Sequence, residues 1–174
     1  MVRSYFCKMI GDKSNSNCSI KDICIKNISI TALGSFAGIG MIAYLAECYS
    51  LALLLPSFGA SAVLLYAACH VPMAQPRNVI GGHIISALMG VITYQLFAST
   101  WWAYAIGVSL AIVAMMLTGT LHPPGGATAF VAIYTGQSFE FIISPVGLGA
   151  VCLVLIALLV NNLSPKRQYP KYWY

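Results

Sequence analysis

Six apolar stretches fill almost all of the chain between residues 28 and 163, and they decide what it can fold into. Hydrophobic residues make up 59% of the 174 residues, and charged residues only 7%. Such a composition is typical of membrane proteins, and the stretches have lengths that cross or enter a bilayer. The sequence therefore predicts an all-α, polytopic membrane protein. The stretches are approximately 28–49, 51–71, 79–98, 103–117, 119–136 and 145–163.

A Pro-led element occurs in both the second and the fifth stretch. Leu54, Pro56, Gly59, Ala60, Ser61 and Ala62 recur 67 positions later as Leu121, Pro123, Gly126, Ala127, Thr128 and Ala129. The same offset aligns the neighbouring segments without a gap, so we expect two three-segment repeats. Proline favours the first turn of a helix. Each element therefore predicts a broken helix that starts within apolar sequence and presents unpaired N–H groups and a positive dipole end.

The placement of the basic residues predicts the topology. Five Lys and Arg precede the first stretch, three follow the last, and Arg77 lies between stretches. If all six segments cross, all nine basic residues face the cytoplasm together with both termini, as the positive-inside rule favours. If the two Pro-led segments are re-entrant, four segments cross and Arg77 faces outside. We expect six crossings with inverted repeats, and four full spans plus two re-entrant segments is the alternative.

Three regions follow from this topology. We expect a cytoplasmic arm at 1–27, a transmembrane domain at 28–163 and a cytoplasmic tail at 164–174. The arm has no continuous apolar run, which argues against a cleaved signal peptide. We expect the protein in a bacterial cytoplasmic (inner) membrane, as a homo-oligomer, because six short segments make a thin wall.

The rare polar residues exclude several classes of function. The basic residues form no stripe with aromatics, so we expect no nucleic-acid partner. Asp12, Asp22, Glu47 and Glu140 are the only acids, which leaves almost no groups for enzyme chemistry. The six cysteines form no CxxC pair. A metal site at His83 and His122 would need a third ligand, so we expect no metal and no cofactor.

Two helix starts near the membrane midplane predict a site for a small inorganic anion. The idealised cost of moving an ion into a low-dielectric interior is about 20 kcal/mol, and a helix start offsets at most about 2 kcal/mol. Further donors are therefore required. The candidate substrate-binding residues with hydroxyl, imidazole or closely approaching backbone N–H groups are Ser57, Gly59, Ser61, Thr120, His122, Gly125, Gly126 and Thr128.

Three further roles are open on the sequence alone. His122 either binds the anion or relays a proton, or it supplies hydrogen bonds to a broken helix end. His83 either faces the pathway or has a partner near the interface. Arg77 either captures anions at the cytoplasmic mouth, because its guanidinium suits oxyanions, or anchors a loop.

Three motifs resemble those of the HPP family of integral membrane proteins. The segment 117–129 contains the His-Pro-Pro of the family name, and 56–62 and 74–83 are similar to its other characteristic segments. The resemblance covers approximately 28–163. It implies four transmembrane helices, which competes with six crossings. Plastid-envelope and cyanobacterial relatives are linked to nitrite transport, so the resemblance implies a small-anion permease, with nitrite as the first candidate substrate.

Anion transport therefore has two alternatives. A structural or assembly subunit would explain the Gly-rich helices but not the repeated breaks inside the membrane, and a transporter or channel for another small solute is also open. Channel-like and proton-coupled transport are not separated by the sequence. We expect a transporter of small inorganic anions that resides in the lipid bilayer.

Overall fold

The computed structural model describes residues 25–49 and 55–173, and within them the chain is helical, without strands. The predicted N-terminal arm lies almost wholly outside the described residues. Two short π-helices and a 3₁₀ turn accompany six α-helices in this part of the chain. The elements are α2 (Ile25–Tyr49), α3 (Pro56–Ala62), η3 (Val63–Ala67), η4 (Pro72–Ala74), α4 (Pro76–Phe97), α5 (Trp101–Leu117), α6 (Pro124–Tyr134), η5 (Ile142–Gly147) and α7 (Leu148–Asn161).

Three helices have the length and composition to cross a membrane. They are Asn27–Tyr49, Pro76–Phe97 and Ile142–Asn161. The Pro-led segment Pro56–Ala67 is an apolar helix of about 18 Å at 1.5 Å per residue, shorter than a hydrocarbon core of about 30 Å. The class of fold is thus confirmed as a helical membrane bundle, and the number of crossings stays a prediction.

Both Pro-led elements begin helices, as predicted. Helix α3 begins at Pro56, and α6 begins at Pro124, one residue after Pro123. The segment α3–η3 ends at Ala67 and α6 ends at Tyr134, which are 67 residues apart. The internal repeat itself stays a prediction, with which these helix bounds agree.

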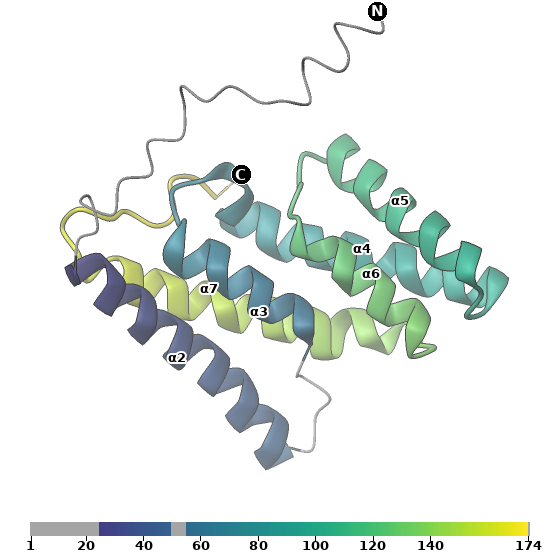
Figure 1. Cartoon of the computed structure of the whole chain (residues 1–174), viewed down its shortest axis with the longest axis horizontal. Coiled ribbons are helices and arrows are strands. Elements are labelled where there is room, and N and C mark those ends of the chain that lie inside the picture. The colour runs from purple at the N-terminus through teal and green to yellow at the C-terminus, as the bar shows by residue number, and fades with distance from the viewer. Residues whose placement is uncertain (1–24, 50–54, 174) are drawn as a thin grey trace, which may run out of the picture.

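The helices form two groups that meet at α3 and along the contact of α4 with η5 and α7 (Figure 1). In one group α4, α5 and α6 pack on one another, and in the other α2 packs on α7. Helix α3 contacts α2, α6 and α7. In Figure 1, α3 lies between the two groups and runs opposite to its neighbour α6. The short Pro-led helices therefore contact each other and join the two groups.

Aromatic side chains of the α3–η3 segment fill grooves made by glycines. The ring of Tyr66 lies across Gly34 and Gly38 of α2, and a Cβ at Gly34 would come within 2.6 Å of it. The ring of Phe58 lies against Gly149 of α7 in the same way. The predicted small-residue face of α2 is therefore used at Gly34 and Gly38, while no atom lies within 4 Å of a Cβ placed at Gly40.

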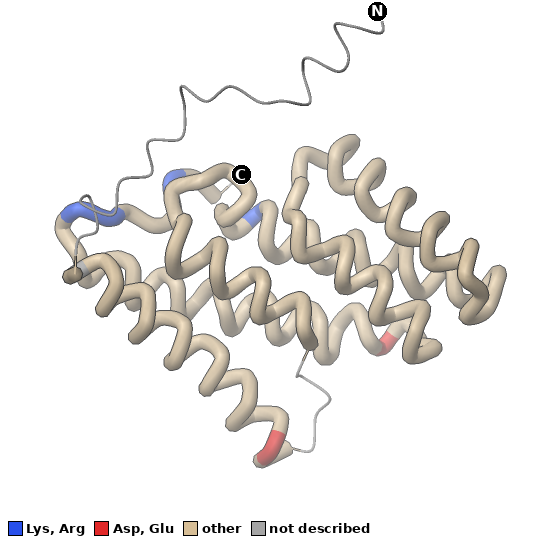
Figure 2. The backbone as a smooth tube through the Cα atoms, in the orientation of Figure 1, with Lys and Arg blue, Asp and Glu red and all other residues tan. Residues whose placement is uncertain are grey.

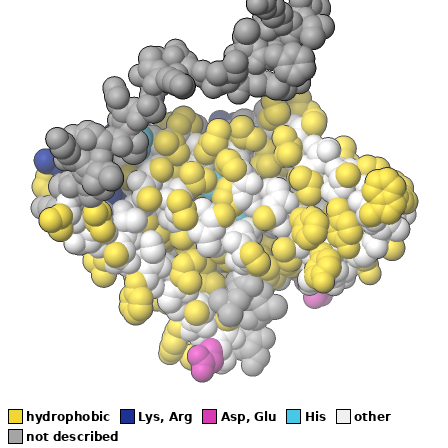
Figure 3. Space-filling model, viewed as in Figure 1, with side chains coloured by type: hydrophobic (Ala, Val, Ile, Leu, Met, Phe, Trp, Pro, Cys, Tyr) yellow, Lys and Arg dark blue, Asp and Glu magenta, His cyan; other side chains and the backbone are white. Residues whose placement is uncertain are grey.

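The outer surface of the bundle is rich in apolar side chains. Figure 3 shows them spread over one face of the molecule. Exposed large side chains on α5 and α6 include Leu110, Val113, Phe130 and Tyr134. Contiguous apolar surface of this kind is a liability in water and matches a lipid environment.

The basic and acidic residues of the described ranges lie at opposite ends of the bundle. Figure 2 shows Lys and Arg at one end and the acids at the other. We call the end with Arg77, Lys166, Arg167 and Lys171 the basic end, and the end with Glu47 and Glu140 the acidic end. Arg77 thus shares an end with the C-terminal tail, which is the arrangement that six crossings predict.

The C-terminal tail folds back and binds the open end of η3. The guanidinium of Arg167 donates to the carbonyls of Tyr66 at 2.8 Å and Asn27 at 2.9 Å. Asn161 donates to the carbonyl of Leu65 at 2.9 Å. Tyr169 is buried and donates to the carbonyl of Ala74, and burial raises the pKa of its phenol so that it keeps this proton. The bonds to Leu65 and Tyr66 satisfy carbonyls at the end of η3 that a helix end leaves without intrahelical partners.

Replacing Arg167 with Ala should lower the thermal unfolding midpoint of the purified protein. Loss of the guanidinium removes its hydrogen bonds to the carbonyls of Tyr66 and Asn27 and leaves Tyr66 with Thr31 as its side-chain donor, at a cost of about 1–3 kcal/mol. The measurement is thermal unfolding in mild detergent, followed by size exclusion. Lys166→Ala, at an exposed neighbouring position, is the control. Equal midpoints for the two variants would contradict this role of Arg167.

Candidate functional site

Four buried polar side chains meet in the middle of the bundle. Ser61 comes from α3, His83 from α4, Thr128 from α6 and His122 from the turn before α6. Each of them has 0% of its surface exposed. Because polar side chains are costly in an apolar bundle, their meeting in one place marks the candidate site. We call these four residues the histidine–hydroxyl cluster.

The cluster is joined by short hydrogen bonds centred on Ser61. Its Oγ lies 2.7 Å from Nε2 of His83 and 2.8 Å from Nε2 of His122. Nδ1 of His83 lies 2.8 Å from Oγ1 of Thr128. Nδ1 of His122 donates to the carbonyl of Met73 at 2.8 Å. Every ring nitrogen therefore has a partner, and both rings are held by hydrogen bonds at each side.

The two rings also pack edge-on. The ring centroids of His83 and His122 are 4.9 Å apart, and those of His83 and Phe58 are 5.3 Å apart. Phe58 and Ser61 are both buried on α3, so this short helix supplies the apolar and the polar partner of His83. The ring of His83 is consequently fixed between α3 and α6.

Glycines allow the backbones to approach closely around His122. A Cβ at Gly82 would lie 2.5 Å from Cβ of His122 and 2.8 Å from the carbonyl oxygen of Thr120. A Cβ at Gly125 would lie 3.2 Å from the carbonyl oxygen of Gly82. The absence of side chains at these two positions lets the turn before α6 sit directly on α4. Gly82 was not among the predicted site residues, although it stands beside His83 in the motif.

The first turn of α4 holds the loop between α5 and α6. Nη2 of Arg77 donates to the carbonyl of Thr118 at 2.7 Å, and Nδ2 of Asn78 donates to the carbonyl of Leu121 at 3.0 Å. Arg77 is exposed at the basic end and lies outside the cluster. The geometry therefore shows it bonded to the loop, as the anchoring interpretation of Arg77 expects.

The other predicted site residues are spread around the cluster. Thr120 is buried, and its side chain faces Gly81. Ser57 is buried one turn before Ser61, and its hydroxyl has no hydrogen-bond partner among the described residues. Gly59 is exposed, and Gly126 is half-buried with only Val108 within 4 Å of an added Cβ. The predicted set thus divides into a cluster, a buried border and exposed positions.

The two helix starts do not converge, in contrast to the arrangement expected from the repeats. His122, just before α6, meets Ser61, which lies in the second half of α3. Because α3 and α6 run in opposite directions, the exposed Pro56 at the start of α3 lies towards the far end of their interface (Figure 1). The site is therefore one helix start, that of α6, packed against the second half of α3.

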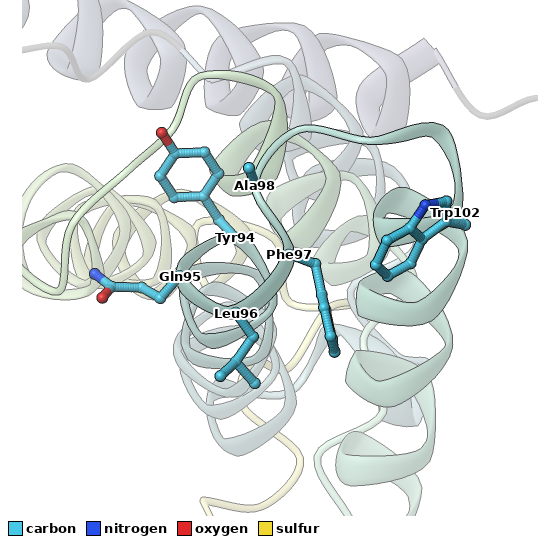
Figure 4. Close-up of a pocket in the computed structure, with 6 residues that line it drawn as sticks. All are labelled: Tyr94, Gln95, Leu96, Phe97, Ala98 and Trp102. Atoms are coloured by element: carbon cyan, nitrogen blue, oxygen red, sulfur yellow. The ribbon is translucent and has the colours of Figure 1, made fainter.

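Hollows on the surface lie away from the cluster. An open hollow of about 650 Å³ surrounds the end of α4, between Tyr94 and Trp102 (Figure 4). Tyr94 follows His83 by eleven residues, or about 16 Å along the helix. A second cavity, of about 270 Å³, lies at the basic end and includes Lys166 and Lys171 in its lining. Neither hollow includes a member of the histidine–hydroxyl cluster.

Within the described ranges, no three side chains of His, Cys, Asp or Glu lie close enough together to hold a metal ion. The two histidines of the cluster have hydroxyl and carbonyl partners instead. Nothing in this geometry supplies the third ligand that a site at His83 and His122 would need. The absence of a metal and of a cofactor stays a prediction.

The fold and the cluster define the class: a polytopic helical membrane protein with polar residues buried in its bundle. A family model described as "HPP, transmembrane region" matches residues 20–170. The chain therefore belongs to the HPP family, as its motifs predict. No solved structure matches the chain.

Two curated relatives come from Dictyostelium discoideum, and both are named only as transmembrane proteins. One is 40% identical over an alignment of 185 residues, gaps included, which covers 99% of this chain and 64% of the relative. The other is 42% identical over 162 residues, which cover 86% of this chain and 52% of the relative. The chain thus spans about half to two thirds of their length. Integral membrane location is supported, and a bacterial inner membrane stays a prediction.

Replacing Gly82 with Ala should destabilise the protein because the new methyl group would overlap His122 and the Thr120 carbonyl. Overpacking of this kind costs about 1–3 kcal/mol. The measurement is the thermal midpoint in mild detergent. Gly126→Ala is the matched control, since its methyl group would meet only Val108, at 3.9 Å. A midpoint for Gly82→Ala at or above that of Gly126→Ala would show that the turn is not tightly seated on α4.

Proposed function

We propose that this protein transports a small inorganic anion across a membrane through the region of the histidine–hydroxyl cluster. The observation that supports the proposal is the burial of two histidines and two hydroxyl residues where the Pro-led helices meet. Intramembrane ionisable residues are expensive and are typical of substrate or proton pathways. An assembly role alone would be served by apolar side chains at the same positions.

The chemistry of the cluster favours an anion over a metal cation. Hydroxyl groups and imidazole N–H groups are donors that can turn towards an anion. The carboxylates of the described residues lie at the acidic end, away from the cluster. The buried hydroxyl of Ser57 has no partner among the described residues, so it is available to donate to a solute that arrives beside Ser61.

The solute must be small and must open the cluster to pass. All four side chains are fully buried, and each ring nitrogen is already bonded to the protein. We infer that the loop before α6 moves during transport, because it carries His122. Its movement would break the hydrogen bonds from Arg77 and Asn78 that hold it to α4. This loop lies at the basic end, where the guanidinium of Arg77 favours the approach of an anion.

Nitrite is the first candidate substrate because of the resemblance to HPP proteins linked to nitrite transport. Nitrate and chloride are alternative inorganic anions, and formate is a carboxylate of similar size and charge. The other candidate functions are transport of a different small solute and a structural role without transport. Direct flux measurements separate them, since a structural subunit gives no flux of any anion.

Uptake of nitrite, nitrate, formate and chloride into proteoliposomes tests the proposal. We expect at least one anion to cross faster than in protein-free vesicles. His122→Leu should reduce this flux at least tenfold, because it removes the bonds to Ser61 and to the Met73 carbonyl.

His70→Leu is the matched control because His70 is exposed and lies outside the cluster. It should keep the flux within about twofold. Both variants must insert and elute as the wild type does. Equal flux in the two variants would remove the cluster from the pathway, and no flux in the wild type would favour a structural role.

We propose six crossings, with the basic end and both termini in the cytoplasm, as the charges favour. Single cysteines at Met73 and Phe139, in a chain with its native cysteines replaced, test this topology. Met73 lies four residues before Arg77 of the basic end, and Phe139 is exposed next to Glu140 of the acidic end. Six crossings predict labelling of the two cysteines from opposite sides of the membrane. Four crossings with two re-entrant segments predict labelling from the same side.

A further inference from the structure

The hydrogens of the histidine–hydroxyl cluster can be assigned from the chemistry of its ends. The carbonyl of Met73 can only accept, so Nδ1 of His122 carries a hydrogen. In a neutral ring, Nε2 of His122 is then an acceptor. The hydroxyl of Ser61, 2.8 Å away, is the group that can donate to it.

The rest of the chain follows from this first bond. Ser61 donates its single hydroxyl hydrogen to His122. Nε2 of His83, 2.7 Å from the same oxygen, must therefore donate to Ser61. Nδ1 of the neutral His83 is then an acceptor, and Thr128 donates to it. All the donors therefore point the same way, from Thr128 through His83, Ser61 and His122 to the Met73 carbonyl.

The hydroxyl of Ser61 has a second acceptor. The carbonyl of Ser57 lies 3.0 Å from its oxygen, one helical turn away. When His122 carries hydrogens on both nitrogens, Nε2 donates to Ser61, and the Ser61 hydrogen turns towards Ser57. The serine can thus serve both a neutral and a charged His122 by rotation of one O–H bond.

We propose that this chain relays protons and couples them to the anion transport proposed above, on which the inference rests. A proton that arrives at Nδ1 of His83 makes that ring an imidazolium. Nε2 of His83 then gives its hydrogen to Oγ of Ser61, while the Ser61 hydrogen moves to Nε2 of His122. His83 is left neutral with its hydrogen on Nδ1, Ser61 is again a hydroxyl, and His122 carries the charge until its Nδ1 gives its hydrogen to water at the basic end.

The two histidines are the titratable groups of the cluster, and the helices packed around them contribute hydroxyl, apolar and sulfur groups. Helix α3 contributes Ser61 and Phe58, α6 contributes Thr128, and α5 contributes the sulfur of Met115 beside Gly82 and Gly125. Arg77 is the charged group on α4, and it is bonded to the Thr118 carbonyl at the surface. Met73 is 37% exposed and lies four residues before Arg77, so the His122 end of the chain of hydrogen bonds lies next to the surface of the basic end.

The tautomers of the two rings test the chain without any transport assay. Nitrogen-15 NMR of the full-length protein with labelled histidine, in lipid bilayers at neutral pH, distinguishes hydrogen on Nδ1 from hydrogen on Nε2. We expect His122 to carry its hydrogen on Nδ1 and His83 on Nε2. His83→Gln and His122→Gln assign the signals. The same tautomer at both positions would overturn the relay.

The ratio of protons to anions tests the coupling. In proteoliposomes that contain a pH-sensitive dye, nitrite and nitrate uptake is measured together with the pH change inside, and protein-free vesicles supply the background. We expect about one proton to accompany each anion in the wild type. Ser61→Ala should bring this ratio close to zero, and Ser61→Thr, which keeps the hydroxyl, should preserve it.

The possible results are separable. Anion flux without protons in the wild type, or an unchanged ratio in Ser61→Ala, would overturn the relay and leave anion transport standing. No anion flux in the wild type would overturn the proposed function and the coupling with it. If Ser61→Ala transports no anion, the tautomers of the wild type decide: opposite tautomers support the relay, and equal ones reject it.

Discussion

A helix that ends inside a bilayer leaves backbone groups that lipid cannot bind, and the architecture of this protein depends on how those groups are satisfied. At the end of η3, the carbonyls of Leu65 and Tyr66 receive donors from Asn161, Thr31 and Arg167. At the break before α6, the carbonyls of Thr118 and Leu121 accept from the side chains of Arg77 and Asn78 on α4. Both breaks therefore require partners from distant parts of the chain, which brings α2, α4, α7 and the tail into one unit.

The two copies of the Pro-led element have different surroundings. At the 67-residue offset, Ser61 corresponds to Thr128, and both belong to the cluster. His122 corresponds to Leu55 and His83 to Ala150, so the histidines occur in one copy of each pair. Gly82 corresponds to Gly149, which accommodates the ring of Phe58 as Gly82 accommodates His122. The predicted repeat thus has close-packing glycines in both copies and titratable histidines in only one.

The sequence predicted the helical class and the starts of the broken helices because hydropathy and proline act locally. It also selected Ser61, His83, His122 and Thr128 as candidates, since polar residues in apolar stretches are rare. It could not predict that Ser61 joins the two rings, because the partners are 22 and 61 residues away and meet only through packing. It could not predict the bond from His122 to the Met73 carbonyl either, because every residue has a backbone carbonyl. The place of the α3 start was missed for the same reason: the direction of α3 against α6 is a property of the assembled bundle.

The sharing of one hydroxyl by two histidine rings has an electrical consequence. Two imidazolium rings 4.9 Å apart would repel, and Ser61 has a single hydrogen to pass between them, so the chain is suited to one excess proton at a time. A negative interior opposes the inward movement of a lone anion by about 2.3 kcal/mol per 100 mV. One proton moving with one anion carries no net charge, so such a carrier would run on concentration and acidity alone, indifferent to the voltage across its membrane.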